Sequence, residues 1–150
     1  MANPTLLIVD DEERFLTTTK ALLQKRGITT FISTSGLKAM EIIGSEHIDV
    51  VILDIKMPGL DGVEVLRVIK KRYPLVEVIM LTGHASAESA VSGLNLGAFD
   101  YLMKPCDIQI MLNKVNQAYA KKEAGDKKAQ QAKIDKIISH PLEVFKKDQE

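Results

Sequence analysis

Several residue types are scarce in this chain, and each scarcity excludes a class of protein. The 150 residues include one cysteine, Cys106, and no tryptophan. A single cysteine excludes an internal disulfide framework and a cysteine-based zinc site. The sequence has no apolar run long enough to span a bilayer, and the apolar stretch Thr5–Val9 is far too short for a signal peptide. We therefore expect a cytoplasmic protein that makes no contact with a membrane.

Neither sign of charge is in excess. Lysine and arginine together number 20, aspartate and glutamate also number 20, and the formal net charge is +0 at pH 7. A balanced chain has no bulk attraction to nucleic acid or to anionic lipid, so we expect no direct nucleic-acid partner. A length of 150 residues is enough for one domain with a sizeable core.

Short apolar runs alternate with amphipathic helical patterns five times along the chain. The runs are Thr5–Val9, Ile28–Ser33, Asp49–Asp54, Val76–Leu81 and Phe99–Met103. The run before Asp54 has four consecutive apolar residues, which is typical of a strand buried on both faces of a parallel sheet. The alternation predicts an α/β fold in which five helices cover both faces of a doubly wound, five-stranded parallel sheet.

The composition becomes polar after about residue 121. Pairs of lysines and glutamines dominate, while Ile134, Ile137 and Ile138 keep helical spacing before Pro141. We expect one domain over residues 1–122 and a polar helical tail or linker over residues 123–150, with no separate output domain. Two interpretations of the tail stay open: a surface helix that adds little to stability, or a helix that docks on the domain or on a partner.

Polar side chains follow four of the five expected strands. Asp10 and Asp11 come after the first strand, Asp54 ends the third, Thr82 ends the fourth and Lys104 follows the fifth. Right-handed crossovers bring the carboxyl ends of parallel strands to one edge, which is where open α/β sheets bind ligands. Three carboxylates beside one lysine repel one another and favour a hard divalent cation, so these oxygen ligands suit Mg²⁺ with several retained waters.

These strand ends resemble the receiver domain of two-component response regulators. The resemblance extends from about Thr5 to Tyr119. The segments that carry it are Val9-Asp10-Asp11-Glu12, Leu53-Asp54-Ile55-Lys56-Met57-Pro58-Gly59-Leu60-Asp61-Gly62, Leu81-Thr82-Gly83-His84 and Asp100-Tyr101-Leu102-Met103-Lys104-Pro105. Each segment alone is a weak signal, but their order and spacing together are specific. The resemblance implies a flavodoxin-like sheet with strand order 2-1-3-4-5.

The resemblance also implies a reaction. Asp54 would accept a phosphoryl group from the phosphohistidine of a histidine kinase or phosphotransfer protein. Mg²⁺ would be held by Asp11, Asp54 and the backbone carbonyl of Lys56, with Asp10 acting through water. Phosphoryl transfer needs mainly positioning and charge neutralisation, which these residues can supply. The chain would take part in its own phosphorylation and dephosphorylation without being a conventional enzyme.

The remaining implied roles concern the signal. Lys104 and Thr82 would contact the phosphoryl oxygens, and the Lys104–Pro105 peptide bond would be cis. Thr82 and Tyr101 would form a switch that is read on the face of the fourth helix, fifth strand and fifth helix. A downstream protein or a second copy of the chain would bind that face.

Three alternatives compete with this interpretation. Phosphatases with an aspartate nucleophile carry a second aspartate two residues later, where this chain has Lys56. A flavin-binding module needs a phosphate-binding loop after the first strand, where the acidic run from Asp10 to Glu13 would repel phosphate. A receiver-like scaffold that is never phosphorylated remains open, although the complete acidic set argues against it.

Overall fold

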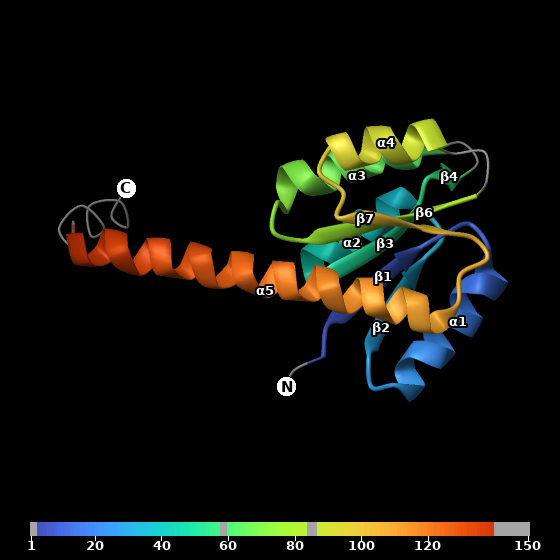
Figure 1. Cartoon of the computed structure of the whole chain (residues 1–150), viewed down its shortest axis with the longest axis horizontal. Coiled ribbons are helices and arrows are strands. Elements are labelled where there is room, and N and C mark those ends of the chain that lie inside the picture. The colour runs from blue at the N-terminus through green and yellow to red at the C-terminus, as the bar shows by residue number, and fades with distance from the viewer. Residues whose placement is uncertain (1–2, 58–59, 84–86, 140–150) are drawn as a thin grey trace.

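The computed structural model of this chain describes residues 3–57, 60–83 and 87–139. Its centre is a parallel five-stranded sheet in the order β2-β1-β3-β6-β7 (Figure 1). The strands are β1 (Thr5–Val9), β2 (Thr29–Ser33), β3 (Val50–Asp54), β6 (Glu77–Thr82) and β7 (Asp100–Met103). Two short strands, β4 (Lys56–Met57) and β5 (Leu60–Asp61), form a separate antiparallel pair. When the five main strands are numbered by their position in the sequence, their order across the sheet is 2-1-3-4-5, as predicted, and the flavodoxin-like α/β fold is confirmed.

Five helices connect these strands, and local signals set several of their ends. They are α1 (Glu13–Lys25), α2 (Gly36–Ser45), α3 (Gly62–Arg72), α4 (Ala87–Asn95) and α5 (Ile108–Ser139). The Ser35 hydroxyl accepts a hydrogen bond from the Lys38 backbone N–H at 3.2 Å, and the Asp61 carboxylate accepts one from Val63 at 3.0 Å. Both are N-terminal caps that satisfy free N–H groups. Gly27 follows α1 with a φ of 79°, a left-handed conformation that glycine adopts without a Cβ clash.

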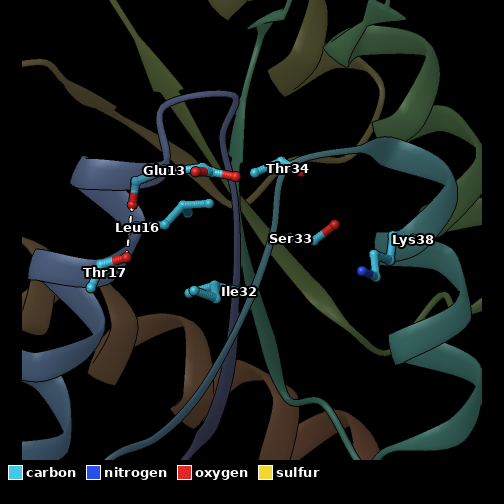
Figure 2. Close-up of a pocket in the computed structure, with 7 residues that line it drawn as sticks. All are labelled: Glu13, Leu16, Thr17, Ile32, Ser33, Thr34 and Lys38. Atoms are coloured by element: carbon cyan, nitrogen blue, oxygen red, sulfur yellow. Dashed lines mark hydrogen bonds between the residues drawn. The ribbon is translucent and has the colours of Figure 1, made fainter.

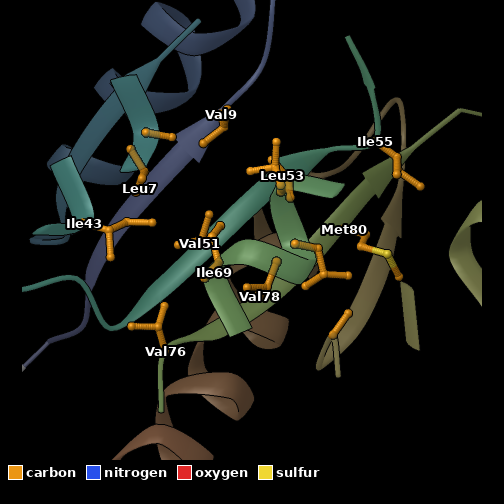
Figure 3. Close-up of a cluster of buried hydrophobic side chains, with 14 of the residues drawn as sticks. Leu7, Val9, Ile43, Val51, Leu53, Ile55, Ile69, Val76, Val78 and Met80 are labelled. Carbon is orange, nitrogen blue, oxygen red and sulfur yellow. The ribbon is translucent and has the colours of Figure 1, made fainter. Parts of the chain in front are cut away.

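The sheet divides the apolar core into two clusters. Because successive side chains of a strand point to opposite faces, Leu7 and Val51 join one cluster while Leu6 and Val50 join the other. The first cluster, part of which Figure 3 shows, packs under α2, α3 and α4. The second packs under α1 and α5. All five positions of β3 and all six of β6 are buried, as expected for central strands covered on both faces.

Helix α5 is longer than the domain that it covers. It runs for 32 residues without a break and leaves the sheet as a long projecting helix (Figure 1). Residues 123–139, which the composition assigns to a separate tail, are the second half of this same helix. Ile134, Ile137 and Ile138 are all exposed on it, whereas Pro141 lies outside the described residues. The predicted domain boundary at residue 122 stays a prediction.

Two buried carboxylates anchor α5 at the amino ends of the central strands. Asp49 precedes β3 and Glu77 begins β6, and the Glu77 backbone N–H donates to the Asp49 carbonyl at 3.2 Å. From α5, Lys122 lies 3.6 Å from Asp49 and Lys121 lies 3.5 Å from Glu77. Lys70 of α3 adds a second cation 3.9 Å from Glu77. These ion pairs fix α5 to the sheet at the point where it leaves the domain.

Lys122→Met is expected to destabilise the domain by about 2–3 kcal/mol. Both members of the Lys122–Asp49 pair are nearly buried, and removal of one partner leaves an uncompensated charge, which usually costs about 3–5 kcal/mol. The expected loss is smaller because Asp49 keeps two other partners, the Thr5 backbone N–H at 2.8 Å and the His47 Nε2 atom at 3.0 Å. Urea denaturation measures the loss. Lys121→Met is the matched control: this side chain is 60% exposed, so we expect a loss below about 1 kcal/mol. Equal losses in both variants would contradict the assignment.

Candidate functional site

Three aspartates meet at the carboxyl edge of the sheet. Asp10 follows β1 and Asp54 ends β3, and these strands are neighbours with Val9 opposite Leu53. Asp11 is exposed, whereas Asp10 and Asp54 are buried. One carboxylate oxygen from each of the three lies within 4.8 Å of the others. The structure thus brings together the three carboxylates that the sequence places at this edge.

The two buried aspartates are oriented by the same local turn. The Asp10 Oδ1 atom accepts a hydrogen bond from the Glu12 backbone N–H at 2.9 Å. The Asp54 Oδ1 atom accepts one from the Lys56 backbone N–H at 3.0 Å. In each case a short polar side chain bonds to the backbone two residues later, which is an ordinary turn arrangement. Because these turns use the Oδ1 atoms, the Oδ2 atom of each aspartate is left to contact other groups of the site.

Lys104 reaches both of these Oδ2 atoms. Its Nζ atom lies 2.7 Å from Asp10 Oδ2 and 3.6 Å from Asp54 Oδ2. Glu12, with an exposed side chain, lies 3.4 Å from the same ammonium. The Lys104 backbone N–H donates to the Thr82 carbonyl at 2.8 Å, and the Lys104–Pro105 bond is cis, as predicted. A lysine after β7 is therefore the cation shared by carboxylates from β1 and β3.

Burial and the charges of neighbouring groups shift the pKa values of Asp10, Asp54 and Lys104. Burial is the main cause that raises the pKa of Asp10 and of Asp54, and each is raised further by a neighbouring aspartate. Burial alone would lower the pKa of Lys104, but its hydrogen bond to Asp10 and the charges around it outweigh burial and raise it. The carboxylates outnumber the lysine, so a further cation would stabilise the ionised site.

In metal-free buffer at neutral pH, Asp54→Asn is expected to raise the melting temperature. A carboxyl whose folded pKa is raised destabilises the folded state while it is ionised, and an amide removes that cost. A gain of about 1 kcal/mol corresponds to roughly 2–8 °C in domains near this size. As the pH falls through the raised pKa, wild-type Asp54 takes up a proton and the gap between the proteins should close. Scanning calorimetry between neutral and acidic pH measures this gap, and a gap that widens on acidification contradicts the prediction.

The other predicted residues lie around this cluster without joining it. Thr82 is buried at the end of β6, where its hydroxyl donates to the Gly83 carbonyl at 2.9 Å. Tyr101 lies on the edge strand β7 and is 40% exposed. The Lys56 side chain is exposed, and its backbone is the part that contacts Asp54.

Sequence reasoning missed a fourth neighbour of Lys104. The Phe15 ring in the first turn of α1 has its centroid 4.9 Å from Lys104 Nζ. In the sequence, Phe15 is one of several apolar residues with helical spacing, and that pattern predicts only a buried helix face. No local signal connects it to a residue after the last strand.

A hollow of about 310 Å³ lies beside the site, between α1 and the segment after β2 (Figure 2). The residues that line it are Glu13, Leu16, Thr17, Ile32, Ser33, Thr34 and Lys38. The Thr17 hydroxyl donates to the Glu13 carbonyl on its wall at 2.9 Å. Asp10, Asp54 and Lys104 do not line it, so the charged cluster lies outside this hollow.

The longest helix of the structure is α5, with 32 residues. Neither it nor any other helix in the described part of the chain combines the length and the apolar character that crossing a membrane requires.

Known response regulators are similar to this chain in sequence. An NtrX-like response regulator of Rickettsia bellii is 41% identical over 102 residues, which are 67% of this chain and 21% of that protein. The DNA-binding transcriptional regulator NtrC of Escherichia coli (strain K12) is 38% identical over 111 residues, which are 74% of this chain and 24% of that protein. The chain therefore spans about a quarter or less of the length of these curated relatives.

Solved structures give the same result. A CheY-like response regulator receiver domain protein from Methanospirillum hungatei has a TM-score of 0.77 and 33% identity, covering 83% of this chain and 99% of that one. The receiver domain of NtrX from Brucella abortus has a TM-score of 0.73 and 32% identity, covering 77% of this chain and 98% of that one. The profile of the response regulator receiver domain matches residues 6–116, which include every residue of the charged cluster. The chain thus belongs to the family of response regulator receiver domains, a signalling family and not one of conventional enzymes.

Proposed function

We propose that this domain accepts a phosphoryl group on Asp54 from the phosphohistidine of a histidine kinase or phosphotransfer protein. The observation that carries the proposal is that the two carboxylate oxygens of Asp54 have different partners. Oδ1 is held by the Lys56 N–H, while Oδ2 lies 3.6 Å from the Lys104 ammonium. Oδ2 would attack the phosphorus, the P–N bond would break, and the donor histidine would leave with the electron pair of that bond.

The three aspartates fit a bound Mg²⁺ ion. They offer only oxygen ligands, their ligand atoms lie within 4.8 Å of one another, and exposed Asp11 leaves room for metal-bound water. We propose that Asp11, Asp54 and the backbone carbonyl of Lys56 hold the ion, with Asp10 acting through water. The ion would neutralise charge on the phosphoryl oxygens and on the carboxylates around them. We expect weak binding, because few carboxylates are offered and Mg²⁺ loses water reluctantly.

Two further residues would contact the transferred group. Lys104 already lies between Asp10 and Asp54, so its ammonium is in place to bind a phosphoryl oxygen. Thr82 would release the Gly83 carbonyl and donate its hydroxyl to another oxygen. Both contacts are hydrogen bonds to a charged acceptor, worth about 1.5–3 kcal/mol each.

The donor also needs a surface beside Asp54, and the chain offers one. A groove of about 590 Å³ runs along α1 to the segment after β7, with Leu22 toward one end and Lys104 and Pro105 among its lining residues. A kinase or phosphotransfer helix with apolar side chains would fit this groove and bring its histidine to the lysine. We propose that the phosphoryl donor docks here.

Acetyl phosphate with Mg²⁺ tests the proposal without the cognate kinase. We expect a single phosphoryl adduct by intact-mass spectrometry, mapped to Asp54 after borohydride reduction of the acyl phosphate. Labelling should need Mg²⁺ and should disappear in Asp11→Ala. Absence of any adduct under these conditions would support the alternative of a scaffold that is never phosphorylated.

Phosphorylation is expected to move Tyr101 from its exposed position to the interior. Once Thr82 turns toward the phosphoryl group, space opens beneath α4, and the half-exposed ring on the adjacent strand can fill it. Structures with and without beryllofluoride, a phosphoryl mimic, measure the change. If Thr82 and Tyr101 keep the same rotamers in both, the switch is wrong.

The output surface would be the face of α4, β7 and α5. It carries exposed apolar side chains from each element, among them Val91, Tyr101, Met103 and Ile110. We propose that this face binds a downstream protein or a second copy of the chain in the phosphorylated state. The relatives that it matches are about three times as long as this chain, so which effector this domain controls is part of the proposal.

A further inference from the structure

Two kinds of group surround the Lys104 ammonium, namely carboxylates and an aromatic ring. Carboxylates of Asp10, Asp54 and Glu12 lie at 2.7, 3.6 and 3.4 Å, and the face of the Phe15 ring lies at 4.9 Å. A cation within about 6 Å of a ring centroid is attracted by the negative face of the ring. The ammonium is therefore contacted by carboxylates and by an aromatic ring.

The Phe15 ring lines the groove into which the Lys104 side chain could turn away from the aspartates. Lys104 keeps 23% of its side chain exposed, and both it and Phe15 line the same groove along α1. Lysine has a flexible four-carbon stem and a compact charge, so its position depends strongly on the groups around it. Phe15 itself is partly buried and packs against the core cluster under α1 and α5, so the ring is a fixed element. An ammonium that turned into the groove would leave Asp54.

We propose that Phe15 is a positioning residue for Lys104, holding the ammonium between Asp10 and Asp54 by a cation–π contact. This inference rests on the proposed phosphorylation of Asp54, and Phe15 itself touches neither the carboxylate nor the phosphoryl group. Loss of the contact lets Lys104 sample positions in the groove, and labelling slows by about fivefold, as expected for one such contact at a partly exposed site.

The chain supplies a matched control at the opposite edge of the sheet. The Phe99 ring lies 5.8 Å from Lys121 Nζ and packs against the same core cluster as Phe15. Lys121 pairs with Glu77 at the amino edge, away from the three aspartates. Changes in ring electronics at position 99 should therefore alter no step at Asp54.

The test replaces Phe15 by 4-fluoro-, 3,5-difluoro- and 3,4,5-trifluorophenylalanine in the full chain. Fluorination weakens the negative face of the ring while nearly preserving its size. With acetyl phosphate and Mg²⁺, the labelling rate should fall stepwise with each fluorine at position 15 and stay constant in the same series at position 99. Phe15→Leu should be about fivefold slower, and Phe15→Tyr should restore the rate because it keeps the ring.

A second measurement needs no phosphorylation. The ring current of Phe15 should shift the Lys104 Cε–Hε resonances upfield, and Phe15→Leu should return them toward random-coil values. If wild type labels normally but the fluorinated series at position 15 is flat, the inference is overturned while the proposed function stands. If wild type does not label at all but the Lys104 resonances shift as expected, the proposed function has failed, and with it the effect of Phe15 on labelling, while the contact that positions Lys104 is supported.

Discussion

Asp54→Asn is expected to lose all detectable labelling by acetyl phosphate. The amide keeps the size of the side chain and can still accept the Lys56 N–H bond through its carbonyl oxygen. It lacks the second anionic oxygen that faces Lys104, so it would offer neither the proposed nucleophile nor one of the proposed Mg²⁺ ligands. Intact-mass spectrometry of wild type and variant under identical Mg²⁺ concentrations measures the adduct.

The control for this loss is Asp61→Asn. Asp61 is another aspartate near the same loop, but it is exposed and its carboxylate caps α3 through the Val63 N–H. Its replacement should leave labelling within about twofold of wild type, since an N-cap asparagine serves nearly as well as aspartate. Equal adducts in wild type and Asp54→Asn would mean that the acceptor is a different residue.

Gly62→Ala is expected to destabilise the domain by about 3 kcal/mol or more and to slow labelling at least ~10-fold. A Cβ atom at Gly62 would lie 2.5 Å from the Ile55 Cα and 2.6 Å from the Asp54 carbonyl oxygen. Both contacts are with backbone, so no side chain can rotate away to relieve them. The first turn of α3 or the end of β3 must move, and the end of β3 carries Asp54.

Gly83→Ala is the matched control for this substitution. Gly83 follows β6 at the same edge of the sheet, but no described atom lies within 4 Å of the position that its Cβ would take. We expect its stability to stay within about 0.5 kcal/mol of wild type. Urea denaturation and the labelling rate together decide the case, and a Gly62→Ala protein as stable and as reactive as Gly83→Ala would rule out the close approach.

The sequence was sufficient for most of the fold and for the composition of the charged cluster. Strand and helix positions follow from hydrophobic periodicity, and parallel strands bring Asp10, Asp54 and Lys104 to one edge whatever their order. The order of the strands came from the family resemblance, because periodicity does not determine which strands are neighbours. The pairing of Lys104 with Phe15 depends on how α1 packs against the segment after β7, and no local pattern records that distance.

The amino edge shows a second limit of sequence reasoning. Asp49 and Glu77 look like solvated charges at strand starts, and Lys121 and Lys122 look like the beginning of a polar tail. In the structure both carboxylates are buried and both lysines bind them. The change of composition near residue 121 therefore marks the point where α5 stops packing against the sheet, and the helix itself continues. Alanine, lysine, glutamine and glutamate are strong helix formers, so α5 continues where its apolar face ends.

The projecting half of α5 gives the domain a lever arm. The helix begins four residues after Lys104, is fixed to the sheet near Lys122, and continues to Ser139. At 1.5 Å per residue, the arm beyond Lys122 is about 26 Å long, so a tilt of about 10° at the domain moves its tip by about 4–5 Å. A displacement too small to alter the core would thus become a movement as wide as a side chain at the far end.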